Sequence, residues 1–239
     1  MNCIILAAGY ATRLYPLTEN FPKPLLPVGG KPILDWLVDD IKDEVDTITV
    51  VTNHKFAINF YAWAKDIPNL AVFDDGTSTN ETRLGAVKDI ELAACDVDTL
   101  VMAGDNVLDF SLVSFIRFAK EKKTSCVMCH EENRLEALQR TAVITTDEND
   151  LITSYEEKPK EPKGHLAVPP FYFYRAEDMA RIGEALEAGC NPDAPGSFAA
   201  WLSKKDPMHA YRMPGKRHDI GDMESYRAVR DSYQGPTLR

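Results

Sequence analysis

Hydrophobic and polar positions follow two different periods along this chain. Short apolar runs rich in Val, Ile and Thr are typical of buried strands, and between them apolar residues recur at the spacing of amphipathic helices. Strands that alternate with helices in this way predict a mostly parallel sheet with helices on its faces. We therefore expect an α/β fold with a doubly wound mixed sheet over about the first 110 residues, followed by an α+β part.

The predicted elements form one continuous series. The strands cover residues 2–7, 47–52, 70–73, 99–103, 125–130, 141–145, 151–156, 165–174 and 209–213. The helices cover residues 32–43, 56–65, 83–94, 112–122, 176–188, 198–203 and 224–232. Turn-forming residues at 147–150 separate two of the strands and predict a hairpin. Because no repeat, low-complexity tract or long linker interrupts the series, we expect a single domain over residues 1–239.

Small and polar residues gather where predicted strands end. In open α/β sheets, ligands bind beyond the carboxyl ends of the strands. This rule selects the loops after Leu6, Phe73 and Ala103 as candidate binding loops.

The loop after the first strand carries the clearest candidate chemistry. Gly9 and its small neighbours let backbone N–H groups approach an anion closely, and Arg13 offers a planar cation suited to phosphate oxygens. Further on, Lys23 stands between Pro22 and Pro24, which restrict the backbone and so the direction of the ammonium group. The loop matches neither a P-loop nor a dinucleotide-binding fingerprint. Either the segment with Gly9 and Arg13 or the segment with Lys23 could by itself belong to an ordinary surface loop. The two segments together, in this order, indicate a phosphate site.

The charge balance narrows the classes of partner. The chain has 27 Lys and Arg against 37 Asp and Glu, a net charge of −10, whereas binding to nucleic acid or an anionic membrane depends on clustered cations. We therefore expect neither kind of partner. The first residues lack the basic region and cleavage site of a signal peptide, and no apolar run reaches the roughly 20 residues that span a bilayer. This predicts a cytoplasmic protein.

Only two of the five cysteines have a suggestive spacing. Cys126 and Cys129 lie in an apolar run that reads as a buried strand. Because residues three apart on a strand point to opposite faces, the two sulfur atoms should not share a zinc ion or a disulfide. We expect reduced cysteines in the core.

The segments LAAGYATRLYPLT (6–18) and PKPL (22–25) resemble the signature of the sugar-phosphate nucleotidylyltransferases, a group that includes glucose-1-phosphate thymidylyltransferases. Matching pieces recur in order to residue 227. The resemblance implies a Rossmann-like nucleotide-diphospho-sugar transferase fold of the GT-A kind, with Arg13 and Lys23 on the triphosphate. One departure is Ala11, which stands where the family usually has glycine. The residues that it implies in nucleotide binding are Leu6, Ala7, Ala8, Gly9, Thr12, Arg13, Lys23, Asn80, Gly85 and Gly104.

A magnesium site follows from the same resemblance. Asp105 comes directly after a hydrophobic strand, where a lone aspartate more often forms a turn or a helix cap. In the family this aspartate is a magnesium ligand, and the second ligand comes from a late Asp-x-Gly motif, which implies Asp219. Two aspartates suffice, because phosphate oxygens and waters complete the shell of magnesium. Asp222 stands where the family has threonine.

The acceptor site is implied by Glu157 and Lys158, which match a Glu-Lys-Pro motif. By resemblance Glu157 accepts hydrogen bonds from acceptor hydroxyls and Lys158 holds the acceptor phosphate, which places Lys158 among the catalytic residues with Arg13, Lys23 and Asp105. Without the other motifs, the pair reads as a solvated ion pair on a hairpin. Asn106 and Pro170 complete the expected acceptor site, although Pro170 departs from the family and removes a backbone donor.

The nucleobase is less well defined. Asn80 occupies the position of a family glutamine that reads a pyrimidine edge, and its shorter amide can still donate and accept. Gly85 aligns with the glycine that opens a helix beside the base. Uracil, thymine and cytosine all stay open.

These features predict a magnesium-dependent enzyme that transfers a nucleotide from a nucleoside triphosphate, expected to be a pyrimidine one, to a sugar 1-phosphate. A phosphate monoester carries about 1.5–2 negative charges at neutral pH and attacks without a general base. Two alternatives stay open: a cytidylyltransferase for a phosphorylated alcohol such as phosphocholine, and a nucleotide-sugar-binding regulator without catalysis. Homo-oligomer formation also stays open.

Overall fold

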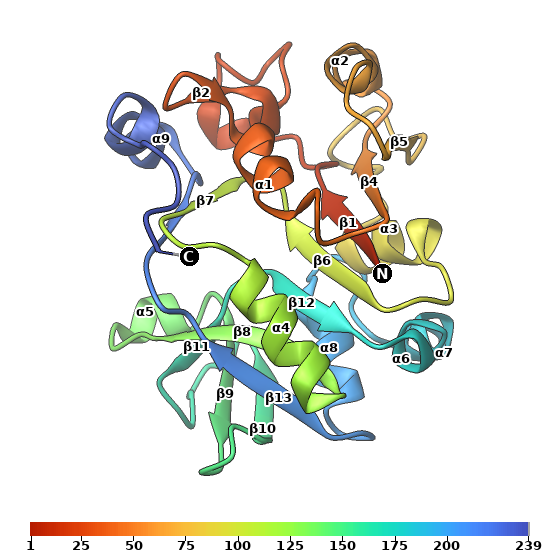
Figure 1. Ribbon diagram of the computed structural model, residues 1–239, viewed down its shortest axis with the longest axis vertical. Helices are drawn as coiled ribbons and strands as arrows, with labels where there is room; N and C mark the ends of the chain where they lie inside the picture. The colour runs from red at the N-terminus through yellow and green to blue at the C-terminus, as the bar shows by residue number, and fades with distance from the viewer. Residues whose placement is uncertain (239) are drawn as a thin grey trace. The chain divides into compact units, whose positions relative to one another are not determined.

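The computed structural model describes residues 1–238 and divides into two compact units (Figure 1). Unit 1 consists of Met1–Leu84, Ala103–Ser114 and the C-terminal segment from Pro214, and unit 2 of Gly85–Met102 and Phe115–Met213. Each unit combines strands with helices, as the α/β periodicity predicts. The expectation of one domain over residues 1–239 stays a prediction.

Unit 1 is built on three parallel strands. In the order β1, β4 and β5 these are Asn2–Leu6, Thr47–Thr52 and Leu70–Asp74. Two short antiparallel pairs accompany them: β2 (Pro27–Val28) with β3 (Lys31–Pro32), and β7 (Asn106–Leu108) with β14 (Arg217–Asp219). The helices are α1 (Ile33–Ile41), α2 (Ala57–Ala64) and α9 (Met223–Arg230), and the first loop contains the 3-10 turns Thr12–Leu14 and Lys23–Leu25.

Unit 2 contains a mostly antiparallel sheet. Its strand order is β10 (Ile152–Glu157), β9 (Ala142–Thr146), β11 (Leu166–Val168), β8 (Ser125–Glu131), β12 (Phe171–Tyr174) and β6 (Thr99–Ala103), and β13 (Met208–Arg212) pairs with β8 in parallel. The helices are α3 (Ala86–Ala93), α4 (Val113–Lys122), α5 (Leu135–Leu138), α6 (Ala176–Met179), α7 (Ile182–Glu187) and α8 (Gly196–Leu202).

An apolar cluster in unit 1 fixes the first loop against the C-terminal helix. Its buried members come from the loop after β1, from α1 and β7, and from α9 with the residues beside it: Leu14, Leu26, Val28, Ile33, Val107, Ile220, Tyr226, Val229 and Tyr233. Burial of apolar surface stabilises such contacts in proportion to the area removed from water. The cluster therefore holds the candidate phosphate loop beside the segment that carries Asp219.

The predicted bounds of helices and strands were accurate for buried apolar runs. They were wrong where prolines interrupt a strand and where short strands pair. The strands at 47–52 and 99–103 have the predicted bounds, and the hairpin around 147–150 is confirmed as β9 and β10. The single strand predicted at 165–174 is wrong. Pro169 and Pro170, which have no N–H group to donate, separate β11 from β12, and the Phe171 N–H bonds back to Pro169 O at 2.7 Å.

Two further differences concern the late part of the chain. The helix predicted at 176–188 is two short helices, because Arg181 leaves the helical region with φ −99° and ψ 6°. The segment 214–222, for which no strand or helix was predicted, contains β14.

Buried thiols confirm the prediction of reduced core cysteines. All five cysteines are free, and Cys3, Cys126 and Cys129 are buried. Burial raises the pKa of Cys126 to about 11 and that of Cys129 to about 12, so both stay protonated at neutral pH.

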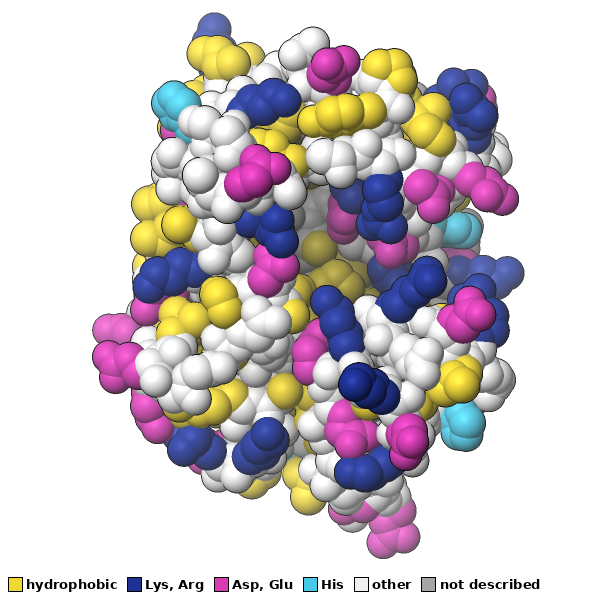
Figure 2. Space-filling model, turned by 180° about the vertical axis from the view of Figure 1, so that it is seen from behind, with side chains coloured by type: hydrophobic (Ala, Val, Ile, Leu, Met, Phe, Trp, Pro, Cys, Tyr) yellow, Lys and Arg dark blue, Asp and Glu magenta, His cyan; other side chains and the backbone are white. Residues whose placement is uncertain are grey.

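The face seen in Figure 2 carries acidic and basic side chains in alternation with apolar ones. Over residues 1–238, none of the helices has both the length and the apolar character that a membrane span requires.

Candidate active site

The loop after β1 is anchored at its start by hydrogen bonds of the backbone. The Gly104 N–H donates to Leu6 O at 2.9 Å, and the Ala7 N–H donates to Val51 O at 2.8 Å. At Ala8 the anchor is a side chain: buried Asn53 donates from Nδ2 to Ala8 O at 2.9 Å and accepts the Phe56 N–H at 3.1 Å. The backbone at Ala8 is therefore held in place from inside the fold, by a residue that the sequence analysis missed.

Gly9 is exposed, and a Cβ built on it would meet no heavy atom within 4 Å. Packing within the chain therefore does not explain this glycine, whereas close approach of a ligand to the backbone would. Thr12 and Arg13, both exposed, follow in a 3-10 turn that buried Leu14 ties to the core. A Cβ on Gly221 would lie 3.7 Å from Arg13 Nη2, so the guanidinium lies beside the segment after Asp219.

Ala11 has a left-handed backbone, with φ 49° and ψ 40°. Its carbonyl accepts the Thr18 hydroxyl at 2.8 Å and the Leu14 N–H at 3.0 Å, which fixes this conformation. An alanine methyl group is unfavourable here, which accounts physically for a glycine at this position in the resembled family.

Replacement of Ala11 by Gly is expected to raise the free energy of unfolding by about 0.5–1 kcal/mol, because relief of the left-handed strain exceeds the entropy that glycine adds to the unfolded chain. Urea denaturation measures the change. The control is Ala228→Gly at an exposed position of α9, where glycine should cost about 1 kcal/mol. Equal losses in both variants would contradict the prediction.

Lys23 joins the first loop to the two aspartates. It opens a 3-10 turn between Pro22 and Pro24, and its side chain is 12% exposed. Its Nζ atom donates to Asp105 Oδ2 at 2.6 Å and to Ile220 O at 2.9 Å. The ammonium group thus contacts the turn between β6 and β7 and the residue after β14 at the same time.

The pairing of β7 with β14 brings the two predicted metal ligands together. Asp219 lies opposite Asn106, and the Ile220 N–H donates to Asp105 O at 3.1 Å. Gly104, the residue before Asp105, has little room for a side chain, since a Cβ there would lie 3.0 Å from Leu34 and 3.1 Å from Ile5. Gly104 therefore lets the chain turn closely over the end of β1.

Asn106 is buried, and both polar atoms of its side-chain amide form hydrogen bonds with neighbouring residues. Its Nδ2 donates to Asp105 Oδ1 at 2.7 Å, and its Oδ1 accepts Arg217 Nη1 at 2.6 Å. Arg217 also lies 3.7 Å from Asp219 Oδ2. Asn106 was expected from the family resemblance to contact the acceptor, and that role stays a prediction. Arg217 was missed, although its position two residues before Asp219 on a strand places both side chains on one face.

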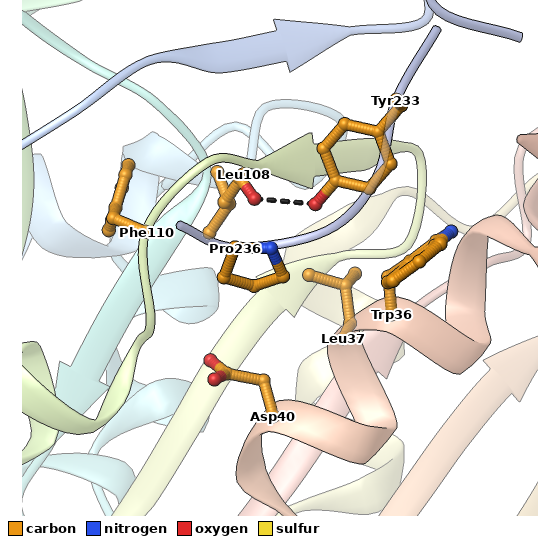
Figure 3. Close-up of a pocket in the computed structure, with 7 residues that line it drawn as sticks. All are labelled: Trp36, Leu37, Asp40, Leu108, Phe110, Tyr233 and Pro236. Carbon is orange, nitrogen blue, oxygen red and sulfur yellow. Dashed lines mark hydrogen bonds between the residues drawn. The ribbon is translucent and has the colours of Figure 1, made fainter. Parts of the chain in front are cut away.

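β7 is also held from its other end, where its last residue meets the C-terminal segment. The Tyr233 hydroxyl donates to Leu108 O at 2.5 Å, and Trp36 packs edge-on against the Tyr233 ring with centroids 5.0 Å apart (Figure 3). A shallow pocket lies here, lined by Trp36, Leu37, Asp40, Leu108, Phe110, Tyr233 and Pro236. These contacts restrict the strand that follows Asp105.

The two aspartates have opposite pKa shifts. Burial disfavours the charge of Asp105, but the charge and hydrogen bond of Lys23, with Arg217 nearby, lower its pKa overall. Restricted solvation and the negative charge of Asp105 raise the pKa of Asp219, against the nearby cations Arg217, Lys23 and Arg13. Two carboxylates that repel each other, surrounded by cations, form a site for charged ligands.

Asp222 caps helix α9. Its carboxylate accepts the Ser225 N–H at 2.9 Å, and Ser225 Oγ accepts the Asp222 N–H at 3.0 Å, a reciprocal capping box. Asp222 therefore has a structural role at the start of the helix that follows Asp219, a role that threonine can also fill.

In unit 2, Glu157 ends β10 opposite Ala142. Among the described residues, its buried Oε2 atom has no hydrogen-bond partner, and neither has the hydroxyl of Tyr155. Gly196 makes room for this carboxylate, since a Cβ there would lie 2.3 Å from Oε2. Burial raises the pKa of Glu157, against the opposing charge of Lys158. An unpaired buried acceptor of this kind suits a ligand that donates hydrogen bonds.

Lys158 and Pro170 differ in their settings. Lys158 is exposed and has a left-handed φ of 47°, held by the bond from its N–H to Thr141 O at 3.1 Å. Strained backbone at a non-glycine residue is common at functional sites. Pro170 is partly buried in the break between β11 and β12.

The two residues expected near the base belong to different units. Asn80 is exposed in unit 1, and its carbonyl accepts Arg83 Nη1 at 2.9 Å. Gly85 starts the helix-bearing segment of unit 2 with φ 96°, and a Cβ there would lie 2.5 Å from Pro192 O. Close packing therefore accounts for Gly85 without a ligand.

Unit 1 therefore brings Arg13, Lys23, Asp105 and Asp219 together at the loop after β1. The model of the nucleotidyl transferase family matches residues 2–235 of the chain. The chain belongs to this family. The resemblance drawn from its first loop is confirmed.

Curated relatives and solved structures agree with the family. The chain is 28% identical to a glucose-1-phosphate adenylyltransferase of Clostridium acetobutylicum, over 93% of this chain and 64% of that protein. It is 32% identical to the bifunctional protein GlmU of Methanocaldococcus jannaschii, over 92% of this chain and 51% of that protein. The chain thus spans less than two thirds of the length of either relative.

The fold of the nucleotidyl transferase family is equally clear in three dimensions. The structure of UDP-glucose pyrophosphorylase complexed with UDP-glucose is similar, with a TM-score of 0.79 at 22% identity over 97% of both chains. This likeness confirms the predicted nucleotide-diphospho-sugar transferase kind of α/β fold.

Proposed function

We propose that this chain transfers a nucleoside monophosphate from a nucleoside triphosphate to a sugar 1-phosphate and releases pyrophosphate. The observation that carries the proposal is the convergence of Arg13, Lys23, Asp105 and Asp219 beside an anchored loop with an open glycine. Family membership supports the reaction class. The sugar phosphate is inferred from the adenylyltransferase relative, which is named for glucose 1-phosphate.

The residues present fit a magnesium ion. Magnesium takes oxygen ligands and is commonly held by one or two carboxylates, with phosphate oxygens and waters completing its shell. The paired Asp105 and Asp219 are a donor set of this kind, and the raised pKa of Asp219 reflects in part the close approach of Asp105. When bound, the ion would neutralise charge on the phosphates.

The side chains of the chain then have separable tasks. We assign Arg13 and Lys23 to the β- and γ-phosphates, where they offset the charge that builds up on departing pyrophosphate. The acceptor phosphate oxygen forms a bond to the α-phosphorus as the bond from that phosphorus to pyrophosphate breaks. Because a phosphate monoester is already an anion, the step requires placement and charge stabilisation rather than a general base.

We assign the acceptor to Glu157 and Lys158, with Asn106 and Pro170 as further candidates. The unpaired Glu157 oxygen would accept hydroxyl protons of a sugar, and Lys158 would meet its phosphate. A pyrimidine is inferred from the Asn80 amide, while the adenylyltransferase relative makes adenine the competing base.

A panel assay of pyrophosphate release tests the proposal. The full chain is incubated with magnesium, each of the common ribo- and deoxyribonucleoside triphosphates, and glucose 1-phosphate, N-acetylglucosamine 1-phosphate or phosphocholine. We expect release that requires both a triphosphate and a sugar 1-phosphate. Release only with CTP and phosphocholine would favour the cytidylyltransferase alternative. No release with any pair, together with binding of nucleotide sugars, would favour a regulator.

Replacement of Glu157 by Gln should raise the free energy of unfolding at pH 7 by about 1 kcal/mol, because the neutral amide avoids burying a charge whose Oε2 atom has no hydrogen-bond partner among the described residues. The raised pKa means that the folded chain binds this proton more tightly than the unfolded chain, whose ordinary value is 4.5. The wild-type chain therefore loses stability as pH rises from 4.5 through the folded pKa. The advantage of the variant should shrink below pH 4.5.

Urea denaturation at pH 4 and pH 7 measures this effect, with Glu156→Gln as the matched control. The neighbouring Glu156 pairs with Lys163 at 2.8 Å, which lowers its pKa, so its replacement should not stabilise the chain. A Glu157→Gln variant that is less stable than wild type at pH 7 would contradict an unpaired carboxylate. Under the proposed function the same variant also has a raised acceptor KM.

A further inference from the structure

Lys23 occupies the carboxylate that the proposed function assigns to magnesium. Its ammonium lies 2.6 Å from Asp105 Oδ2, and the other oxygen, Oδ1, accepts the Asn106 amide at 2.7 Å. Both oxygens of Asp105 therefore already have donors. A metal ion that uses Oδ2 therefore competes with the ammonium group for this oxygen.

The ammonium is held there by more than one contact. It also donates to Ile220 O at 2.9 Å, and the side chain is only 12% exposed. The prolines on either side limit the backbone, and buried Pro24 and Leu25 complete the turn. Lys23 is therefore a cation tethered at the aspartate pair and not a surface lysine that meets Asp105 occasionally.

Charge repulsion opposes the presence of both the Lys23 ammonium group and a metal ion at the aspartate pair. A divalent ion on Asp105 and Asp219 would lie within a few ångströms of the ammonium, and like charges at such distances repel strongly in a partly buried setting. The triphosphate of a nucleotide offers Lys23 an alternative set of anionic oxygens. The ammonium group of Lys23 can pair either with the carboxylate of Asp105 or with the triphosphate oxygens, but not with both at the same time.

We propose that Lys23 acts as a tethered counter-cation that closes the aspartate pair to metal until a nucleotide draws it onto the phosphates. Metal alone then binds weakly, and metal binding becomes conditional on nucleotide. The inference rests on the proposed function for the identity of the metal ligands. It adds an order of events, in which metal binds tightly only together with the nucleotide or after it.

The test is binding of Mn²⁺ alone, without nucleotide or acceptor, to the full chain. The free Mn²⁺ signal in electron paramagnetic resonance gives the dissociation constant. Lys23→Met keeps the apolar stem and removes the charge, so it should bind Mn²⁺ at least about tenfold more tightly than wild type. Lys31→Met is the matched control, since Lys31 pairs with Asp39 at 2.5 Å in the same unit. It should leave the affinity unchanged.

A second variant locates the metal. Adding Asp105→Asn to Lys23→Met should abolish the gain, and retention of tight binding in the double variant would overturn the proposal. Unchanged or weaker Mn²⁺ binding in Lys23→Met, with a cooperative unfolding transition that shows the variant to be folded, would also overturn it and leave the ion pair a structural contact. Because no turnover is measured, these results stand apart from the outcome of the pyrophosphate assay.

Discussion

Replacement of Asp105 by Asn is expected to lower kcat/KM by about a thousandfold, because a metal held by this carboxylate supplies several kcal/mol of charge stabilisation to the transition state. The side chain cannot be replaced by a neighbour, since Asn106 beside it is buried and engaged by Arg217. Asparagine keeps the shape and one acceptor oxygen but loses the charge. We therefore expect the loss to persist at high magnesium concentration.

The Asp105→Asn measurement needs a stability control. The nearby Lys23 lowers the pKa of Asp105, so its carboxylate stabilises the fold above its ordinary pKa of 3.8, and this contribution is lost as pH falls through the lowered folded value. Urea denaturation at pH 7 shows whether the variant is folded at the assay temperature. Asp66→Asn, at an exposed residue after α2, is the matched control and should retain wild-type turnover. Turnover within a few-fold of wild type in Asp105→Asn would contradict the assignment of this carboxylate.

Arg13→Ala is expected to lower kcat by about 10²–10³, the effect of removing one donor that stabilises developing charge. Arg13 is exposed and its guanidinium lies beside Gly221, so its removal leaves the core intact. The KM for the acceptor should change little, because the interaction concerns the leaving pyrophosphate. Steady-state kinetics with varied acceptor and saturating triphosphate separate the two parameters.

Two further variants bracket the Arg13 result. Arg13→Lys should recover only part of the rate, because lysine offers a point charge instead of a planar fork for phosphate oxygens. Arg230→Ala removes an exposed arginine that pairs with Asp231 in the same unit, and it should not change kcat. An Arg13→Ala enzyme with near-normal kcat would place the leaving-group contact elsewhere.

Periodicity predicted the strands at 47–52 and 99–103 well because most of their residues are buried. These runs, Thr-Ile-Thr-Val-Val-Thr and Thr-Leu-Val-Met-Ala, consist of apolar residues and threonine, a composition typical of buried strands. The segment 165–174 looks similar, but two prolines without N–H groups divide it into two strands. Both strands pair with β8, whereas the second partner is β9 for β11 and β6 for β12. Local apolarity indicates burial and does not specify which neighbours a strand pairs with.

The candidate site was predictable as a set of residues and not as an arrangement. Small residues, Arg13 and Lys23 mark the phosphate loop because this chemistry has few substitutes. By contrast, β7 and β14 have three residues each, too few for a periodic signal. Their pairing joins Asn106 to Arg217 across 111 positions of sequence, a distance at which local pattern carries no information.

The sequence by itself determined the family, the alternating α/β order and the identity of the charged residues, because the chemistry of phosphate binding restricts residue type at short spacing. The tertiary structure decided which of these charges meet. It set Lys23 on Asp105, aligned Asp219 with Asn106 and used Asp222 as a helix cap. It also left the Oε2 atom of Glu157 without a hydrogen-bond partner within residues 1–238. Such contacts depend on strand register and on the close packing of distant segments, which only the folded chain defines.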